Sequence, residues 1–195
     1  MAPELVVVGC SWGGLAALRE LLAPLPRSLR AAVAVAQHRG ADSTHGMLAA
    51  VLRARIALPV EEAEDKLPIR PGRVYLAPPD YHLLVEPDSF ALSVDELVQF
   101  SRPSIDVLFE SAADSFGERA IAVVLTGANA DGAAGVARIR ARGGLMLAQD
   151  PAEAERAEMP AAAIATGAVE RVLSLGAIAG LLAERCAGAA GVEAA

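Results

Sequence analysis

Cysteine, positive charge and closely spaced metal ligands are all scarce in this sequence, and each scarcity excludes a class of protein. The two cysteines, Cys10 and Cys186, are far apart in the chain, so we expect neither a disulfide framework nor a zinc site. The formal net charge of −7 leaves no basic surface for nucleic acid. Three histidines without paired ligand spacing predict no metal, and we expect no cofactor.

Long apolar runs are missing as well. No stretch approaches membrane-spanning length, and no basic N-terminal segment precedes an apolar run. We therefore expect no membrane insertion and a cytoplasmic location.

The residues that are abundant predict a single α/β domain. Hydrophobic residues make up 54% of the 195 residues and are mainly Ala, Val and Leu, which suits helices packed tightly on a parallel sheet. Strand patterns alternate with helix patterns, so we predict a doubly wound, mostly parallel sheet with helices on both faces. His82–Val85 and Phe90–Val94 are predicted to pair as an antiparallel hairpin. We expect one domain over residues 1–187 and a disordered tail over 188–195.

The stretch that organises the chain lies at its N-terminus. Leu5–Val8 has the pattern of a buried strand, and leucines recur at helical spacing from Leu15. The intervening residues 9–13, GCSWG, match the G-x-S-x-G nucleophile elbow, which presents Ser11 at the start of a helix. A loop for a nucleotide phosphate is the alternative, but glycines at 9, 13 and 14 do not fit G-x-G-x-x-G.

His38 favours the elbow over the nucleotide loop. It follows the second predicted strand, where a dinucleotide fold would place an acid. A serine hydroxyl needs a base, and His38 is our candidate. Asp131 follows a later central strand and is our candidate to orient the imidazole; an N-cap of the following helix is its alternative role. Since the carboxyl ends of parallel strands share one edge, we expect Ser11, His38 and Asp131 to lie there together.

Other residues are assigned to the walls of this predicted site. Oxyanion donors are expected from the backbone N–H of Trp12 or Gly13 and from the turn 127–130, which includes Ala128 and Asn129. His82 could line the pocket or lie on a surface hairpin.

Three local predictions concern the rest of the chain. We predict a helix that begins with Asp42 or Ser43 as its N-cap and includes His45. The acidic run 61–65 is predicted to be a solvated loop, and Pro103 is predicted to lie in the first turn of a helix.

With these residues assigned, the chain resembles the catalytic domain of chemotaxis protein-glutamate methylesterases over about residues 5–182. The resemblance implies a Rossmann-like domain in which Ser11 is the nucleophile, His38 the base and Asp131 its orienter. It also implies hydrolysis of glutamyl methyl esters on the cytoplasmic helices of chemoreceptors, with deamidation of receptor glutamines in some relatives. The markers are GCSWGG at 9–14, QH at 37–38, EAED at 62–65, YLAP at 75–78 with His82, RPSIDVLF at 102–109, LTG at 125–127, DGAAG at 131–135, AQ at 148–149 and MP at 159–160.

Three departures from the family pattern bear on substrate and control. The catalytic segment is not preceded by the usual receiver domain, so we expect that this control is either absent or supplied by a separate regulatory protein. Trp12 stands where better-known members have Thr, and residues 128–130 replace a common Met-Gly-x. A carboxylesterase for another substrate and a non-catalytic receptor-binding module therefore remain alternative functions.

Overall fold

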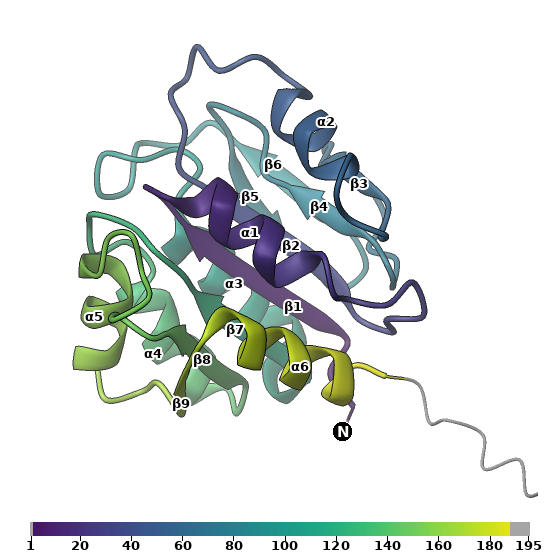
Figure 1. Ribbon diagram of the computed structural model, residues 1–195. Coiled ribbons are helices and arrows are strands. Elements are labelled where there is room, and N and C mark those ends of the chain that lie inside the picture. The colour runs from purple at the N-terminus through teal and green to yellow at the C-terminus, as the bar shows by residue number, and fades with distance from the viewer. Residues whose placement is uncertain (1, 188–195) are drawn as a thin grey trace, which may run out of the picture.

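The computed structural model describes residues 2–187, which form a seven-stranded parallel sheet with helices on both faces (Figure 1). The strand order is β3-β4-β2-β1-β7-β8-β9, with β1 at the centre. A separate antiparallel pair, β5-β6, confirms the predicted hairpin. The bounds of the strands are β1 Leu5–Cys10, β2 Ala32–Gln37, β3 Val60–Glu62, β4 Val74–Leu76, β5 His82–Val85, β6 Phe90–Ser93, β7 Ala120–Val124, β8 Leu145–Gln149 and β9 Arg171–Leu173.

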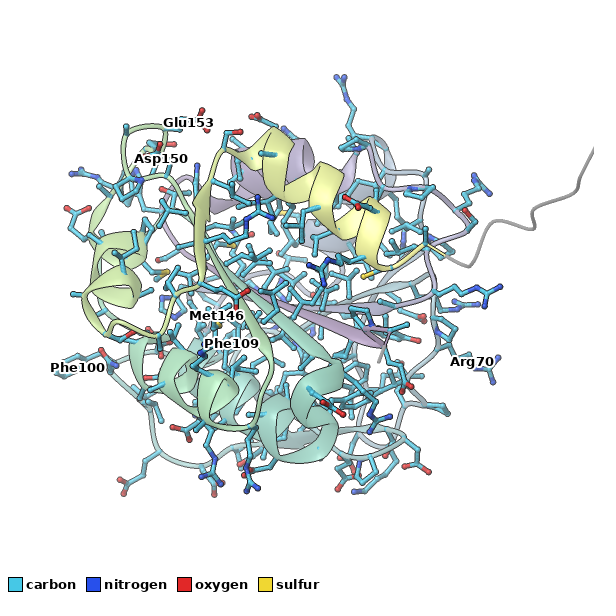
Figure 2. All side chains as sticks on the ribbon, turned by 90° about the horizontal axis from the view of Figure 1, so that it is seen from below. Arg70, Phe100, Phe109, Met146, Asp150 and Glu153 are labelled. Atoms are coloured by element: carbon cyan, nitrogen blue, oxygen red, sulfur yellow. The ribbon has the colours of Figure 1, made fainter. Side chains whose placement is uncertain are left out.

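Alternation along the central strands divides the core into two layers. Side chains of successive strand residues point to opposite faces, so Val6 and Val8 pack against α1, α2 and α6, while Leu5 and Val7 pack against α3, α4 and α5. Phe109 and Met146 belong to this second layer and lie in the interior (Figure 2). The helices are α1 Gly14–Leu22, α2 Met47–Arg53, α3 Ile105–Phe116, α4 Ala133–Ala141, α5 Glu158–Ala165 and α6 Leu175–Arg185, with a 3₁₀ turn, η1, at Gly117–Arg119.

Strand register brings the ends of β1, β2 and β7 to the same edge of the sheet. Cys10 pairs with Gln37 and Gly9 pairs with Val124. The residues that follow these strands therefore leave the sheet side by side, at its carboxyl edge. This is the edge at which the three candidate residues were expected.

Three local predictions are wrong. The helix α2 begins at Met47 with Gly46 at its N-cap position, so Asp42 and Ser43 do not cap it and His45 lies in the preceding turn. Its first turn thus lacks the expected side-chain cap because a glycine with a φ of 73° makes the entry instead.

The acidic run is also not a solvated loop throughout. Glu61 and Glu62 belong to β3, and the Glu62 carboxylate accepts a hydrogen bond of 2.9 Å from Arg39. Pro103 precedes α3, because Ser104 is the N-cap residue and its hydroxyl accepts from the Val107 N–H.

Within residues 2–187 no helix has the length and apolar character needed to cross a membrane. The predicted tail, 188–195, lies outside the described residues. That residues 1–187 form a single domain stays a prediction.

Candidate active site

A cavity of about 460 Å³ opens at the carboxyl edge of the sheet, beyond β1 and β2. It contains the residues that follow three different strands, together with a segment that precedes α3. Its walls carry hydroxyl, imidazole, amide and guanidinium groups beside apolar side chains, so it can hold a polar substrate atom close to a base. The lining residues are Ser11, His38, Arg39, Gly40, Ala41, Asp80, Leu97, Phe100, Ser101, Arg102 and Asn129.

Ser11 leaves the end of β1 in a turn that is tied to β7. Its N–H donates to the Thr126 carbonyl at 2.9 Å, and its own carbonyl accepts from Gly14 at 2.9 Å. Gly13 adopts a φ of 76° at the entry to α1, where a side chain would be strained and would meet Glu155. Gly127 lies so near that a Cβ there would be 3.0 Å from the Ser11 Cβ. The elbow and the turn after β7 therefore touch.

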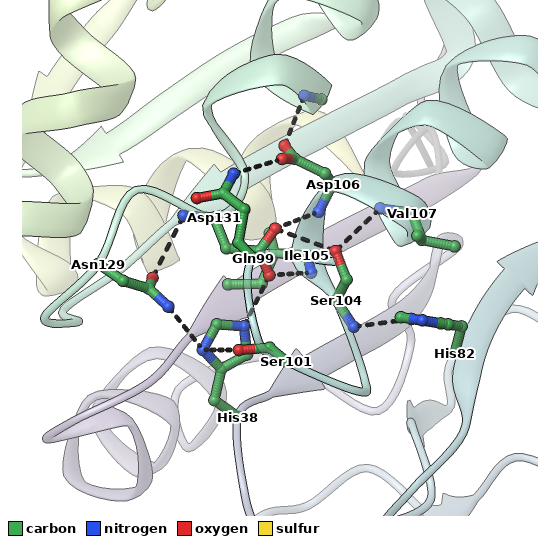
Figure 3. Close-up of polar contacts among 11 residues, drawn as sticks. His38, His82, Gln99, Ser101, Ser104, Ile105, Asp106, Val107, Asn129 and Asp131 are labelled. Carbon is green, nitrogen blue, oxygen red and sulfur yellow. Dashed lines mark hydrogen bonds and ion pairs between the residues drawn. The ribbon is translucent and has the colours of Figure 1, made fainter. Parts of the chain in front are cut away.

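His38 is held between a carboxylate on one side and two hydrogen-bond donors on the other (Figure 3). Its Nε2 lies 2.7 Å from Asp131 Oδ2. Its Nδ1 lies 3.4 Å from both the Ser101 hydroxyl and the Asn129 amide nitrogen. A carboxylate can only accept, so Nε2 carries the proton and Nδ1 presents a lone pair toward the cavity. That is the tautomer a general base needs.

Asp131 is buried and accepts four hydrogen bonds. Oδ2 accepts from His38 and, at 2.7 Å, from the Ile105 N–H; Oδ1 accepts from the Ser104 hydroxyl and the Asp106 N–H, each at 3.0 Å. Burial alone would raise the pKa of Asp131, but the hydrogen bonds from His38, Ile105 and Asp106 outweigh it and lower the pKa below its usual value. The carboxylate is therefore ionised and rigidly aimed.

Asp131 caps α3 and not α4, the helix that follows it in the chain. The N-cap position of α4 is Gly132, without a side-chain bond, so the alternative role of Asp131 as a cap of the following helix is wrong. Its carboxylate instead meets the first backbone N–H groups of α3, which an anion stabilises. One side chain thus anchors α3 and orients His38.

A second buried carboxylate, Asp106, lies next to this group. It accepts from the Gly135 N–H at 2.8 Å and from the Gln99 amide at 3.0 Å. Burial raises the pKa of Asp106; the bond from Gly135 opposes the shift, and the negative charge of Asp131 adds to it.

Ser11, the third candidate residue, lines the same cavity but takes no part in the hydrogen bonds between His38 and Asp131. Within residues 2–187 Ser11 makes no side-chain hydrogen bond to His38, whereas Ser101 lies within bonding distance. Sequence reasoning missed Ser101, because it follows no strand and belongs to no catalytic motif. It reaches His38 only through the fold of the segment before α3.

The predicted wall residues fall into two groups. In the described part of the chain the backbone N–H groups of Trp12, Gly13 and Ala128 make no internal hydrogen bond, but these three residues are not in the cavity lining, which includes Asn129. Asn129 contributes its side chain: its Oδ1 accepts from the Asp131 N–H at 3.2 Å, which turns its amide nitrogen toward His38.

His82 lies neither on the surface nor in the cavity lining. It is buried behind α3, where Nδ1 accepts from the Ser104 N–H at 3.1 Å and Nε2 donates to the Glu96 carbonyl at 3.0 Å. Both ring nitrogens are used, so its role is to join the 94–101 segment to the start of α3.

Cys10, beside the elbow, faces the other way. It is buried in the layer of α1 and α6, and this burial raises the pKa of its thiol. A thiol kept protonated is a poor nucleophile. No group of three or more metal-ligating side chains occurs among the residues described.

Comparisons with known proteins point to one family. The sequence model of the CheB methylesterase family, described as "CheB methylesterase", matches residues 6–182. A Leptospira interrogans protein whose name gives protein-glutamate methylesterase and protein-glutamine glutaminase as its activities is 46% identical over 179 residues, which cover 91% of this chain and 92% of that protein.

A longer relative and a solved structure extend the comparison. The protein-glutamate methylesterase FrzG of Myxococcus xanthus is 42% identical over 88% of this chain and 51% of its own length. The crystal structure of the Thermotoga maritima CheB methylesterase catalytic domain superposes with a TM-score of 0.90 at 32% identity, covering 94% of this chain and 99% of that one. The predicted fold class is confirmed.

Proposed function

The chain belongs to the CheB methylesterase family, and on that premise we propose that it hydrolyses the γ-methyl esters of glutamate side chains in methyl-accepting chemotaxis receptors. Ser11 is the nucleophile, His38 the general base and Asp131 the residue that orients it. The substrate segment is the cytoplasmic helical region of the receptor, so the reaction takes place in the cytoplasm. Receptor glutamine amides are a second substrate of the same site.

Each of the two steps of the reaction needs two proton transfers through one nitrogen. His38 Nδ1 takes the Ser11 proton as Oγ attacks the ester carbonyl, and the resulting oxyanion accepts hydrogen bonds from the backbone N–H groups of Trp12 and Ala128. Collapse breaks the bond to methoxide, which leaves as methanol with the proton from Nδ1. Water then attacks the glutamyl-Ser11 ester by the same route and releases the glutamate carboxylate and free Ser11. A glutamine substrate would release ammonia in place of methanol.

The observation that carries the proposal is the contact of 2.7 Å between His38 and Asp131. A carboxylate held by three further donors fixes the imidazole with its open nitrogen toward the cavity that Ser11 lines. The negative charge stabilises the imidazolium that forms during the reaction.

Ser101 is the competing nucleophile, since its hydroxyl is the one within 3.4 Å of Nδ1. Two features favour Ser11. It stands at the start of α1, beside unbonded backbone N–H groups that can bind an oxyanion. Ser101 instead lies in the tight turn before α3, and the first N–H groups of that helix are already bonded to Asp131. Rotation of the Ser11 side chain about χ1 is the movement that the proposal requires.

Methanol release from methylated receptor membranes tests the proposal with Ser11→Ala and Ser101→Ala as a matched pair. We expect Ser11→Ala to lose about 10⁴-fold or more of the turnover and Ser101→Ala to stay within about tenfold of the parent. A serine-reactive phosphonate should label a peptide containing Ser11. Full activity in Ser11→Ala, or labelling of Ser101 in its place, would refute the assignment. If the parent protein releases no methanol, the proposal that methylated receptors are its substrate is refuted.

A further inference from the structure

The mouth of the cavity carries an unusual concentration of exposed apolar side chains. Among the described residues seven large hydrophobic side chains are exposed, and three of them, Val94, Leu97 and Phe100, lie within one seven-residue segment. Phe100 is 97% exposed and projects away from the body of the protein (Figure 2). Leu97 and Phe100 also line the cavity that contains Ser11.

The backbone of this segment is held firmly in place. Arg102 donates to the carbonyls of Val94 at 2.7 Å and Asp95 at 2.9 Å. The same guanidinium is fixed by Asp80 at 2.6 Å. His82 donates a hydrogen bond of 3.0 Å to the Glu96 carbonyl. Because the backbone is already fixed, little backbone freedom is lost when a partner covers these side chains.

The turn that carries Phe100 is strained. Gln99 and Phe100 have φ angles of 48° and 64°, a region that non-glycine residues rarely adopt. Two hydrogen bonds between Val98 and Ser101 and one from Gln99 to Asp106 maintain the turn. This conformation leaves the Phe100 ring exposed instead of packing it against the protein.

A second exposed aromatic residue follows Ser11 directly. Trp12 is 60% exposed, yet its Nε1 donates to Glu155 at 2.8 Å and the Arg156 guanidinium lies 5.6 Å from the ring centroid. The Thr126 hydroxyl fixes the Trp12 carbonyl at 2.9 Å. The polar edge of the indole is therefore satisfied, and its exposed surface is free for apolar contact.

We propose that Trp12, Leu97 and Phe100 form an apolar rim that binds the substrate protein beside the ester. The rim takes the apolar side chains that flank the esterified glutamate in the substrate. The inference rests on the proposed function: a glutamate side chain is short, so the chain that bears it must lie across the mouth when its ester reaches Ser11. Leu97 and Phe100 line the cavity and Trp12 follows Ser11 directly, so the rim adjoins the surface that the substrate has to cover.

Two substrates that carry the same γ-methyl ester distinguish an effect on binding of the substrate protein from an effect on hydrolysis of the ester. One is the methylated receptor; the other is N-acetylglutamate γ-methyl ester, which has no flanking residues. The variant Phe100→Asn removes the ring while a residue tolerant of positive φ preserves the turn. Phe100→Tyr restores the ring, and Val172→Thr, at an exposed valine in β9, is the control.

Methanol release should report a change in selectivity. For Phe100→Asn we expect the ratio of kcat/KM for the receptor to kcat/KM for the single-residue ester to fall about tenfold or more, mainly through the receptor KM. Phe100→Tyr and Val172→Thr should keep the parent ratio. An unchanged ratio in Phe100→Asn, or an equal loss on both substrates, would refute the proposed rim and leave the proposed function standing. If the parent hydrolyses neither ester, the proposed function fails and the rim fails with it.

Discussion

Replacing Asp131 with Asn separates the two tasks that its carboxylate performs. The carboxylate accepts two hydrogen bonds on each oxygen, and in either orientation of an Asn amide the nitrogen would face two of those donors. On one side the nitrogen opposes the Ile105 N–H and His38; on the other it opposes the Asp106 N–H. One N–H of the first turn of α3 loses its acceptor in both cases.

The consequences for stability and for turnover differ in size. An unsatisfied buried N–H costs about 1–3 kcal/mol, which leaves a domain with roughly 5–15 kcal/mol of stability folded. Turnover should fall about 10⁴-fold, or roughly 5.5 kcal/mol at the barrier. With the amide nitrogen toward His38, Nε2 must accept and the proton moves to Nδ1; with the amide oxygen toward it, the charge that stabilises the imidazolium is gone.

Ser104→Ala is the matched control for this substitution. It removes one hydrogen bond to the same carboxylate and the N-cap of α3, but does not touch His38. We expect about 0.5–2 kcal/mol of lost stability and turnover within about tenfold of the parent. Urea unfolding gives the stability, and methanol release per folded molecule gives the turnover. Equal losses of turnover in Asp131→Asn and Ser104→Ala would refute the orienting role and leave Asp131 as an anchor of α3.

Three further substitutions test the surroundings of the site. His82→Ala removes the partners of the buried Ser104 N–H and of the Glu96 carbonyl and leaves a cavity, so it should lower the free energy of unfolding by about 2–4 kcal/mol in urea titrations; a value under 0.5 kcal/mol would contradict its structural role. Asp106→Asn should raise the melting temperature at pH 7, because a raised pKa means that the ionised carboxyl opposes folding, and the gain should vanish as the pH falls below about 3, where the parent carboxyl is protonated in both states; a gain that persists there would refute this. Gly135→Ala places a Cβ 2.5 Å from that of Phe109 and should cost about 1–3 kcal/mol by thermal unfolding, while an unchanged melting temperature would show that α3 and α4 can move apart.

Much of the fold could be predicted from local patterns. Apolar β-branched runs and the change from strand to helix period across residues 9–14 are properties of neighbouring residues. Parallel pairing follows from the alternation of strands and helices, and it brings the ends of β1, β2 and β7 together. That His38 and Asp131 would lie at one edge therefore needed no tertiary information.

The predictions that failed concern the residues at which helices begin and the assignment of one acidic segment to a loop. Asp42 and Ser43 are residue types that favour the N-cap position before α2, but Gly46 occupies that position in a left-handed conformation. The acidic residues at 61–62 have the composition of a loop, yet Glu62 joins an edge strand because Arg39 is there to pair with it. Such choices depend on partners that are distant in the chain, which a local pattern does not contain.

The sequence by itself determined which strands Ser11 and His38 follow and that the ends of both strands meet at one edge, because direction and period are local properties of the backbone. Only the tertiary structure decided that Asp131 would cap α3 instead of α4, and that Ser101 would reach His38. Those contacts join residues 25 to 63 positions apart, and they exist because α3 packs against the sheet with Ile105 of its first turn beside Gly9 in β1 and its first N–H groups at Asp131.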